Sequence, residues 1–327
     1  MPARTQAPPP RLGPRPLPLH LGMALSGWLS SLAALRLSRS GSLNWRRADQ
    51  AQATSLQEAL AEADPEALAR ALGAEAAGRI GTFVAGIEGY RAHPYHRRLE
   101  DPPVLWQAGT TRVLAFGGEA AGAPVLLVPS LINRAYILDL TANRSFARYL
   151  RERGLRPYLL DWGAPGADER DFGLDDYILG RLAPALEAVH RDAGRPVVLA
   201  GYCMGGTLVL PLAAREDVAA LVLLATPWDF WADGRHQARL IAAQLPGLTA
   251  LIEGLEQLPP DALQAMFAAL DPLLAARKFS AFAALPPASA AARNFVALED
   301  WLNDAVPLTG PVAPACLEDW YGANAPA

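Results

Sequence analysis

Cys203 stands in a stretch of sequence with the residue types and spacing of a catalytic nucleophile. An apolar run at residues 197–200 is followed by residues 201–206, with the sequence GYCMGG, and then by residues that favour a helix. A sharp strand-to-helix turn of the pattern G-x-C-x-G needs small residues, because the backbone is strained and strand and helix approach closely. The turn presents its central side chain at the carboxyl edge of a sheet. We therefore predict that Cys203 is a nucleophile on an elbow whose small residues are Gly201, Gly205 and Gly206.

The chemistry that suits a cysteine at this turn is acyl transfer through a thioester. A thiolate is a strong nucleophile, and the thioester it forms passes its acyl group readily to a second acceptor. The backbone N–H of Met204, directly after the cysteine, is expected to point at the oxyanion that forms during attack. The alternative is a glycine-flanked turn whose cysteine only packs against its neighbours.

A second stretch, residues 128–140 with the sequence VPSLINRAYILDL, follows another apolar run. In strand–elbow–helix folds the loop after an early strand carries a second oxyanion donor. We expect the backbone N–H of Ile132, or that of Leu131 beside it, to take this role. The alternative is an ordinary strand–helix loop in which polar residues are structural or cap a helix; these residues are Asn133, Arg134 and Asp139.

Around these motifs, short apolar runs alternate with segments of helical spacing. Such runs are typical of strands that are buried on both faces of a parallel sheet. Strands are predicted at residues 106–116, 124–128, 156–160, 196–200 and 218–225, and helices at 137–153, 174–193 and 204–215. The alternation predicts an α/β fold with a doubly wound, mostly parallel sheet. Residues 230–300 are instead helical and rich in Ala, Leu and Pro, as in a cap inserted over a substrate site.

Composition divides the chain into four predicted parts. They are a Pro- and Arg-rich tail that is expected to be disordered (1–18), an N-terminal helical segment (19–100), the α/β core (101–229), and a helical cap with the start of an incomplete C-terminal part (230–327). Within the second part, Asp64-Pro65-Glu66 has the pattern of a helix start.

The largely apolar residues 17–37 have three interpretations. His20 and Arg36 interrupt the run and no small-residue cleavage site follows, so a packing helix is favoured over an interfacial membrane or granule contact, and over a signal or anchor. The net charge of −4, without a basic excess, argues against a nucleic-acid partner. Two cysteines, Cys203 and Cys316, make no disulfide framework, which fits a reduced, cytoplasmic compartment.

Several motifs together resemble the poly(3-hydroxyalkanoate) synthase family. They are residues 133–140 (NRAYILDL), 161–162 (DW), 175–178 (DDYI), 201–207 (GYCMGGT) and 224–230 (LATPWDF), and the resemblance covers roughly residues 85–325. It implies an α/β-hydrolase fold and a cysteine acyltransferase that moves 3-hydroxyacyl groups from coenzyme A onto a polyester such as poly(3-hydroxybutyrate), with Cys203 as nucleophile. It further implies a homodimer, contact with a polyester granule, and no cofactor beyond the coenzyme A thioester substrate.

That family's nucleophile works with an aspartate and a histidine, yet no histidine follows His236 in this sequence. A base must take the thiol proton, and in an α/β-hydrolase chain the order is nucleophile, acid, histidine. Asp229 and His236 are the remaining candidates, although so short a separation rarely places both partners correctly. We expect instead that the acid and the histidine belong to a segment beyond Ala327, in which case the chain as given is inactive.

Other polar and aromatic residues have simpler interpretations. His93 and His96 flank Pro94 without a Cys or carboxylate cluster, so we predict no metal site. Polar residues between 300 and 304 are expected to lie on a helix surface or to cap it. The aromatic residues near the C-terminal end are expected to pack in the cap or to line an acyl channel; they are Trp301, Trp320 and Tyr321.

Three functions are consistent with this sequence. The first is a polyester synthase-type acyltransferase, and the second is a thioesterase or esterase that uses the same cysteine with water as acceptor. The third is a non-catalytic relative that binds a granule surface or a partner, which the missing acid and histidine favour. Fold class alone does not decide among them.

Overall fold

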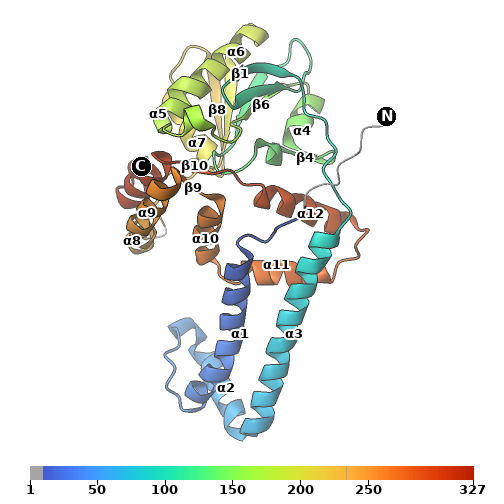
Figure 1. Ribbon diagram of the computed structural model, residues 1–327, viewed down its shortest axis with the longest axis vertical. Coiled ribbons are helices and arrows are strands. Elements are labelled where there is room, and N and C mark those ends of the chain that lie inside the picture. Colours follow the sequence, from blue (N-terminus) through green and yellow to red (C-terminus); the bar gives the residue numbers. More distant parts are fainter. Residues whose placement is uncertain (1–9, 233) are drawn as a thin grey trace. The chain divides into compact units, whose positions relative to one another are not determined.

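A computed structural model describes residues 10–232 and 234–327 of the protein, which form two compact units (Figure 1). The helical unit contains the residues up to Pro94 together with Gln264–Val296. The sheet unit contains Tyr95–Leu263 together with Ala297–Ala327. The predicted cap, residues 230–327, is therefore divided between the two units. Residues 1–9 of the predicted tail lie outside the described residues, and the four-part division by composition stays a prediction.

The helical unit is built mainly from three N-terminal helices and α11. Their bounds are α1 (Leu17–Arg39), α2 (Gln50–Glu62), α3 (Pro65–Ala92) and α11 (Leu274–Ala283), with a short 3-10 turn at η1 (Arg47–Asp49). The predicted start of α3 is confirmed: the Asp64 carboxylate accepts a hydrogen bond from the Glu66 N–H (3.1 Å), and Pro65 occupies the first turn. Among the helices described, none is long and apolar enough to cross a bilayer.

Aromatic rings join α3 to α11 and to α1. Phe83 and Tyr90 are almost fully buried, and both meet the Phe279 ring edge to face at centroid distances of 6.3 and 5.6 Å. Gly86 lets α3 and α11 approach, because a Cβ at this position would lie only 2.0 Å from the Phe279 carbonyl oxygen. Trp28 of α1 meets the Phe83 ring at 6.4 Å, so α1 packs within this unit.

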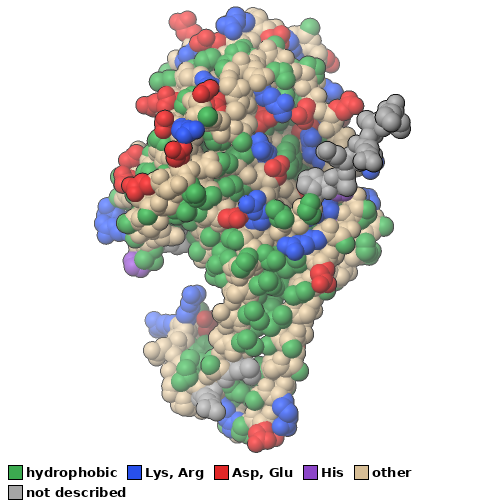
Figure 2. Space-filling view, viewed as in Figure 1, with side chains coloured by type: hydrophobic (Ala, Val, Ile, Leu, Met, Phe, Trp, Pro, Cys, Tyr) green, Lys and Arg blue, Asp and Glu red, His purple; other side chains and the backbone are tan. Residues whose placement is uncertain are grey.

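Apolar side chains also reach the surface of this unit. Leu25, Leu29 and Val84 are each more than a third exposed, and Figure 2 shows hydrophobic side chains over α1 and α3. Burial of this unit's apolar residues is thus concentrated where α1, α3 and α11 meet.

A six-stranded sheet forms the centre of the sheet unit. The strand order is β1-β2-β6-β3-β7-β8; the pairs β1–β2 and β2–β6 are antiparallel and the other three pairs are parallel. The strands are β1 (Val104–Ala108), β2 (Thr111–Ala115), β3 (Pro124–Val128), β6 (Arg156–Asp161), β7 (Val197–Tyr202) and β8 (Val218–Leu224). The mostly parallel sheet that the sequence predicts is confirmed.

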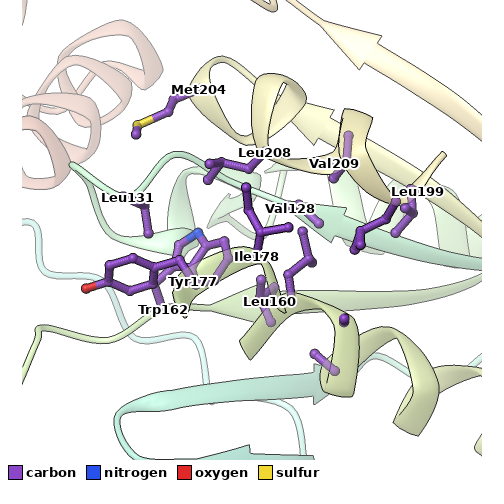
Figure 3. Packing of buried hydrophobic residues seen from close by; sticks show 14 of the residues in the cluster. Val128, Leu131, Leu160, Trp162, Tyr177, Ile178, Leu199, Met204, Leu208 and Val209 are labelled. Carbon is purple, nitrogen blue, oxygen red and sulfur yellow. The ribbon is translucent and has the colours of Figure 1, made fainter. Parts of the chain in front are cut away.

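Helices cover both faces of the sheet, and successive residues of each strand face opposite ways. On one face, Leu126 and Val128 of β3 belong to a cluster (Figure 3) with the helices α5 (Leu174–Tyr177), η4 (Ile178–Leu182), α6 (Ala183–Ala193) and α7 (Met204–Val209). On the other face, Val125 and Leu127 pack with η2 (Ala135–Leu138) and α4 (Phe146–Glu152). This two-sided burial explains why the sequence of β3 is an unbroken apolar run.

One predicted strand is in fact a hairpin. Residues 106–116 contain parts of both β1 and β2, which pair antiparallel across a turn at Gly109 and Thr110. Gly109 has a φ of 56°, a conformation that glycine adopts without strain and that favours a tight reversal. The buried Glu169 accepts hydrogen bonds from the Thr110 N–H (3.0 Å) and hydroxyl (2.6 Å), which fixes the turn.

The prediction of one long helix at residues 137–153 is wrong. The segment holds the end of η2, a small antiparallel pair formed by β4 (Asp139–Thr141) and β5 (Arg144–Ser145), and then α4. The reason is tertiary: the Asp139 side chain is buried and accepts hydrogen bonds from Arg148 (2.7 and 3.0 Å) and Arg97 (3.3 Å). The Ser145 hydroxyl then caps α4 by accepting from the Arg148 N–H.

Helical structure follows β8, as the sequence predicts. The helices are α8 (Arg235–Ala242), α9 (Leu245–Leu255), α10 (Pro260–Leu270) and α12 (Ala290–Asn303), and they are followed by α13 (Val312–Ala315) and the π-helical η6 (Cys316–Gly322). A short sheet joins β9 (Gln257–Leu258) to β10 (Leu308–Thr309). Two further 3-10 turns are η3 (Ala167–Glu169) and η5 (Leu210–Leu212). Through the β9–β10 pair, the C-terminal residues belong to the sheet unit.

β8 forms one edge of the large sheet and pairs only with β7 in the part of the chain that the structure describes. Its side chains are unusually exposed for an apolar strand: Val222 and Leu223 are 41% and 45% exposed. An exposed apolar edge strand is a ready site for further strand pairing.

We expect Asp139→Asn to destabilise the protein by about 3 kcal/mol, because it removes the charge that two partly buried guanidinium groups share. Urea unfolding measures the loss. The control is Glu75→Gln, which breaks the exposed Glu75–Arg79 pair on α3 and should cost no more than about 0.5 kcal/mol. Equal losses in the two variants would show that Asp139 does not organise this segment.

Candidate active site

Cys203 lies at the junction of β7 and α7 in a conformation rare for a residue with a side chain. Its φ is 54° and its ψ is −129°. The Cys203 N–H donates to the Leu224 carbonyl of β8 (2.9 Å), and its own carbonyl accepts from the Gly206 N–H (2.9 Å). The backbone is thus held in a strained turn from both sides, which is the geometry of a nucleophile elbow. The side chain is half-buried, so it keeps access to solvent.

The three elbow glycines each sit where a side chain cannot fit. A Cβ on Gly201 would lie 2.4 Å from the Gly206 Cα, and one on Gly206 would lie 1.8 Å from the Thr226 Oγ1. A Cβ on Gly205 would lie 2.1 Å from the Val128 carbonyl oxygen, at the end of β3. Gly205 therefore brings the elbow into backbone contact with the loop that follows β3. We call this loop, residues 129–134, the β3 loop.

The two predicted oxyanion donors differ in their surroundings. No acceptor for the Met204 N–H occurs among the described residues, so this donor is free to meet a ligand. The Ile132 N–H instead donates to the Ser130 hydroxyl at 3.4 Å, a long and weak hydrogen bond. Leu131 and Met204 lie toward the same end of the core cluster in Figure 3. The oxyanion roles of Met204 and Ile132 stay predictions.

Tyr321, in the C-terminal part of the chain, lies within electrostatic range of Cys203, and the sequence gives no sign of this proximity. Burial raises the pKa of Tyr321, and the negative charges that Cys316 and Cys203 carry when ionised raise it further. The Tyr321 ring meets Phe230 edge to face at 4.9 Å, and its carbonyl accepts from the Trp231 indole (3.0 Å). In the sequence these residues are separated by about 90 positions, so spacing alone gives no signal of the contact.

The candidate acid and base are not brought together. The Asp229 carboxylate accepts hydrogen bonds from the Trp231 N–H and from the Asn324 side-chain amide (both 2.9 Å), so it closes a turn. His236 is exposed on α8. In the described part of the chain, no hydrogen bond joins His236 to Asp229 or to Cys203. The geometry gives no support for Asp229 and His236 as triad partners.

His93 and His96, which are close in the sequence, have different surroundings. His93 is buried at the end of α3, and its Nε2 lies 2.9 Å from the Pro287 carbonyl oxygen, whereas His96 is exposed. Among the described residues, no three His, Cys, Asp or Glu side chains gather in a way that would hold a metal ion.

The two cysteines should differ sharply in reactivity. Burial raises the pKa of Cys316 to about 12, with a smaller contribution from Asp319. At pH 8 its thiolate fraction is then on the order of 10⁻⁴, so its raised pKa rather than its exposure limits its reactivity, since both cysteines are half-buried. We expect iodoacetamide to alkylate Cys203 first, and Cys316 to react about tenfold faster for each added pH unit below 12. Peptide mass spectrometry of the wild type and of Cys203→Ser checks this; prior labelling of Cys316 contradicts it.

Gly205→Ala should destabilise the protein by about 3 kcal/mol, because the added methyl group meets backbone atoms of Val128 and Pro129 that cannot move aside. The matched control is Gly180→Ala, on the exposed side of a helix, where nothing lies within 4 Å of the added Cβ. Chemical denaturation compares the two. A Gly205→Ala protein as stable as the control would rule out the close approach.

Comparison with protein families agrees with this architecture. Residues 123–296 match the protein family described as "alpha/beta hydrolase fold". The Poly(3-hydroxyalkanoate) polymerase subunit PhaC of Haloarcula marismortui is 31% identical over 68% of this chain and 50% of its own length. The protein of the same name from Haloferax mediterranei is 34% identical over 62% of this chain and 42% of its own. Among solved structures, an alpha/beta hydrolase fold protein from Burkholderia ambifaria is 19% identical, with a TM-score of 0.36, and the match covers 70% of this chain and 77% of that one.

The chain spans about half the length of the curated relatives it matches. Within that span, the similarity that the motifs predict is confirmed. The family match extends over more than half of the chain, and the parallel sheet and the elbow have the arrangement that this family requires. The chain therefore belongs to the α/β hydrolase fold family and is similar, over part of its length, to the poly(3-hydroxyalkanoate) polymerases.

Proposed function

We propose that the protein is an acyltransferase in which Cys203 takes a 3-hydroxyacyl group from coenzyme A as a thioester and passes it to a polyester chain. The observation that carries the proposal is the position of Cys203, in a strained turn between β7 and α7. The partial similarity to polymerases of poly(3-hydroxyalkanoates) supports the same chemistry. A homodimer, a granule surface and a cytoplasmic location belong to this proposal.

The chemistry has two steps. In the first, the Cys203 sulfur attacks the thioester carbonyl, coenzyme A leaves as a thiol, and the thiol proton of Cys203 passes to it by way of a base. In the second, the hydroxyl of the acceptor attacks the Cys203 thioester, loses its proton and releases the thiol. The free N–H of Met204 is suited to stabilise the oxyanion in both steps. The proposal assigns the base to neither Asp229 nor His236.

Water in place of the hydroxyl acceptor would make the same site a thioesterase. The accessible elbow and the α/β hydrolase family match are compatible with this second function. The two functions share the acyl-enzyme and differ only in what attacks it, so the product distinguishes them.

The proposal predicts that 3-hydroxybutyryl-coenzyme A adds one acyl mass to Cys203 when the assay uses the full-length protein, with its acid and base. Intact-protein and peptide mass spectrometry follow the adduct, and the soluble and insoluble products are separated and weighed. Insoluble polyester supports transfer, and free 3-hydroxybutyrate supports hydrolysis. Cys203→Ala should abolish the adduct, while Cys316→Ser, which changes the second thiol with its raised pKa, should keep it. No adduct on the wild type, or one that persists in Cys203→Ala, would contradict both functions and favour a binding role.

A further inference from the structure

We propose that Trp301 and Asp304 are positioning residues that fix the β3 loop, and with it the oxyanion donors beside Cys203. The inference rests on the proposed acyl transfer for its kinetic consequence, but the contacts that support it are independent of that function. All the residues involved belong to the sheet unit.

The segment that follows α12 runs antiparallel to the β3 loop and bonds to its backbone. The Val306 N–H donates to the Ile132 carbonyl (3.2 Å), and Asn133 forms an antiparallel bridge with Ala305. The Trp301 indole Nε1–H donates to the Arg134 carbonyl at 2.7 Å, the shortest of these bonds. The backbone of the β3 loop is thus tied to residues that follow it by about 170 positions in the sequence.

Asp304 interacts with side chains at the Arg134 end of the β3 loop. Its carboxylate lies 3.5 Å from the Arg134 Nε. Burial raises the pKa of the Tyr136 hydroxyl, and the negative charge of Asp304 raises it further, so this side chain also lies near Asp304. The Arg97 guanidinium stacks over the Tyr136 ring at 5.2 Å, which restrains that ring from the other side. These groups line a polar cavity of about 250 Å³ behind the loop. On this side, Arg134 at the end of the loop is therefore paired with the opposite charge of Asp304.

The start of the β3 loop is fixed separately. The buried Trp162 indole donates to the Pro129 carbonyl (2.9 Å), and the tight contact of Gly205 with Val128 and Pro129 holds this end against the elbow. The loop is anchored at the Pro129 end by the core and at the Arg134 end by Trp301.

Because the peptide bond is planar, a hydrogen bond to one residue's carbonyl also restricts the direction of the next residue's N–H. In a trans peptide, the carbonyl of one residue and the N–H of the next point in opposite directions. Bonds to the carbonyls of Pro129, Ile132 and Arg134 therefore fix three peptide planes. The N–H groups of Leu131 and Ile132 lie on the two planes between those of the Pro129 and Ile132 carbonyls. Loss of the Trp301 bond at Arg134 therefore acts on these donors indirectly, by loosening the antiparallel pairing with Ala305 and Val306 that holds the Ile132 carbonyl. The long bond from Ile132 to Ser130 is too weak to hold these donors.

The test compares two reactions of the same sulfur. Acylation of Cys203 passes through an oxyanion, whereas alkylation by iodoacetamide does not. Trp301→Phe keeps the ring but removes the N–H, and Asp304→Asn keeps the shape but removes the charge. We expect Trp301→Phe to slow acylation by 3-hydroxybutyryl-coenzyme A about tenfold, and Asp304→Asn about threefold, with alkylation of Cys203 unchanged. Trp106→Phe, on β1 and outside the site, is the control for ring substitution and should change neither rate.

Hydrogen exchange of residues 129–136 is a second readout that needs no activity. The inference requires faster exchange there in Trp301→Phe than in Trp106→Phe. Unchanged exchange overturns it, and so does acylation at the wild-type rate or a parallel loss of acylation and alkylation. A wild type that is alkylated but never acylated refutes the proposed function instead, and hydrogen exchange then decides the positioning role by itself.

Discussion

The fold around the candidate site depends on one close backbone contact, between Gly205 at the start of α7 and the end of β3. With no Cβ at Gly205, the turn that carries Cys203 can rest directly on the Val128 and Pro129 carbonyls. This contact sets the distance between the nucleophile and the β3 loop, where the oxyanion donors are predicted. Gly201 and Gly206 extend the same tight packing to β7 and to the residues after β8. Strain at Cys203 is tolerated because neighbouring strands over-determine its backbone.

The central strands supply the rigidity that this contact needs. β3 and β7 are hydrogen-bonded on both sides and packed by helices on both faces, so neither strand can shift without opening the core. The edge of the sheet is different. β8 ends beside the elbow and its Leu224 carbonyl holds the Cys203 N–H, yet much of its apolar surface is exposed. The rigid side of the site is therefore the β3 side.

Residues distant in sequence complete the surroundings of the cysteine. Tyr321 of η6 lies within electrostatic range of Cys203, and the Trp301–Val306 segment bonds to the backbone of the β3 loop. The predicted packing or channel role of Trp301 stays a prediction, and in addition its indole donates a hydrogen bond to a backbone carbonyl of the β3 loop. Asp304 is exposed, as predicted for a surface residue, and it also pairs with Arg134. The site is thus assembled from four separated stretches of the sheet unit.

The sequence by itself determined the elements whose causes are local. An unbroken apolar run marks a strand that is buried on both faces, proline after aspartate starts α3, and small residues around Cys203 mark a turn too tight for side chains. These patterns were enough to predict the parallel sheet, the elbow and the helical insertion after β8. Tertiary structure alone decided the segment after η2, because the buried Asp139 bonds to Arg97 from a distant stretch and breaks the expected helix. It alone also placed Trp301 against the β3 loop, since a hydrogen bond between residues about 170 positions apart leaves no periodic trace in the chain.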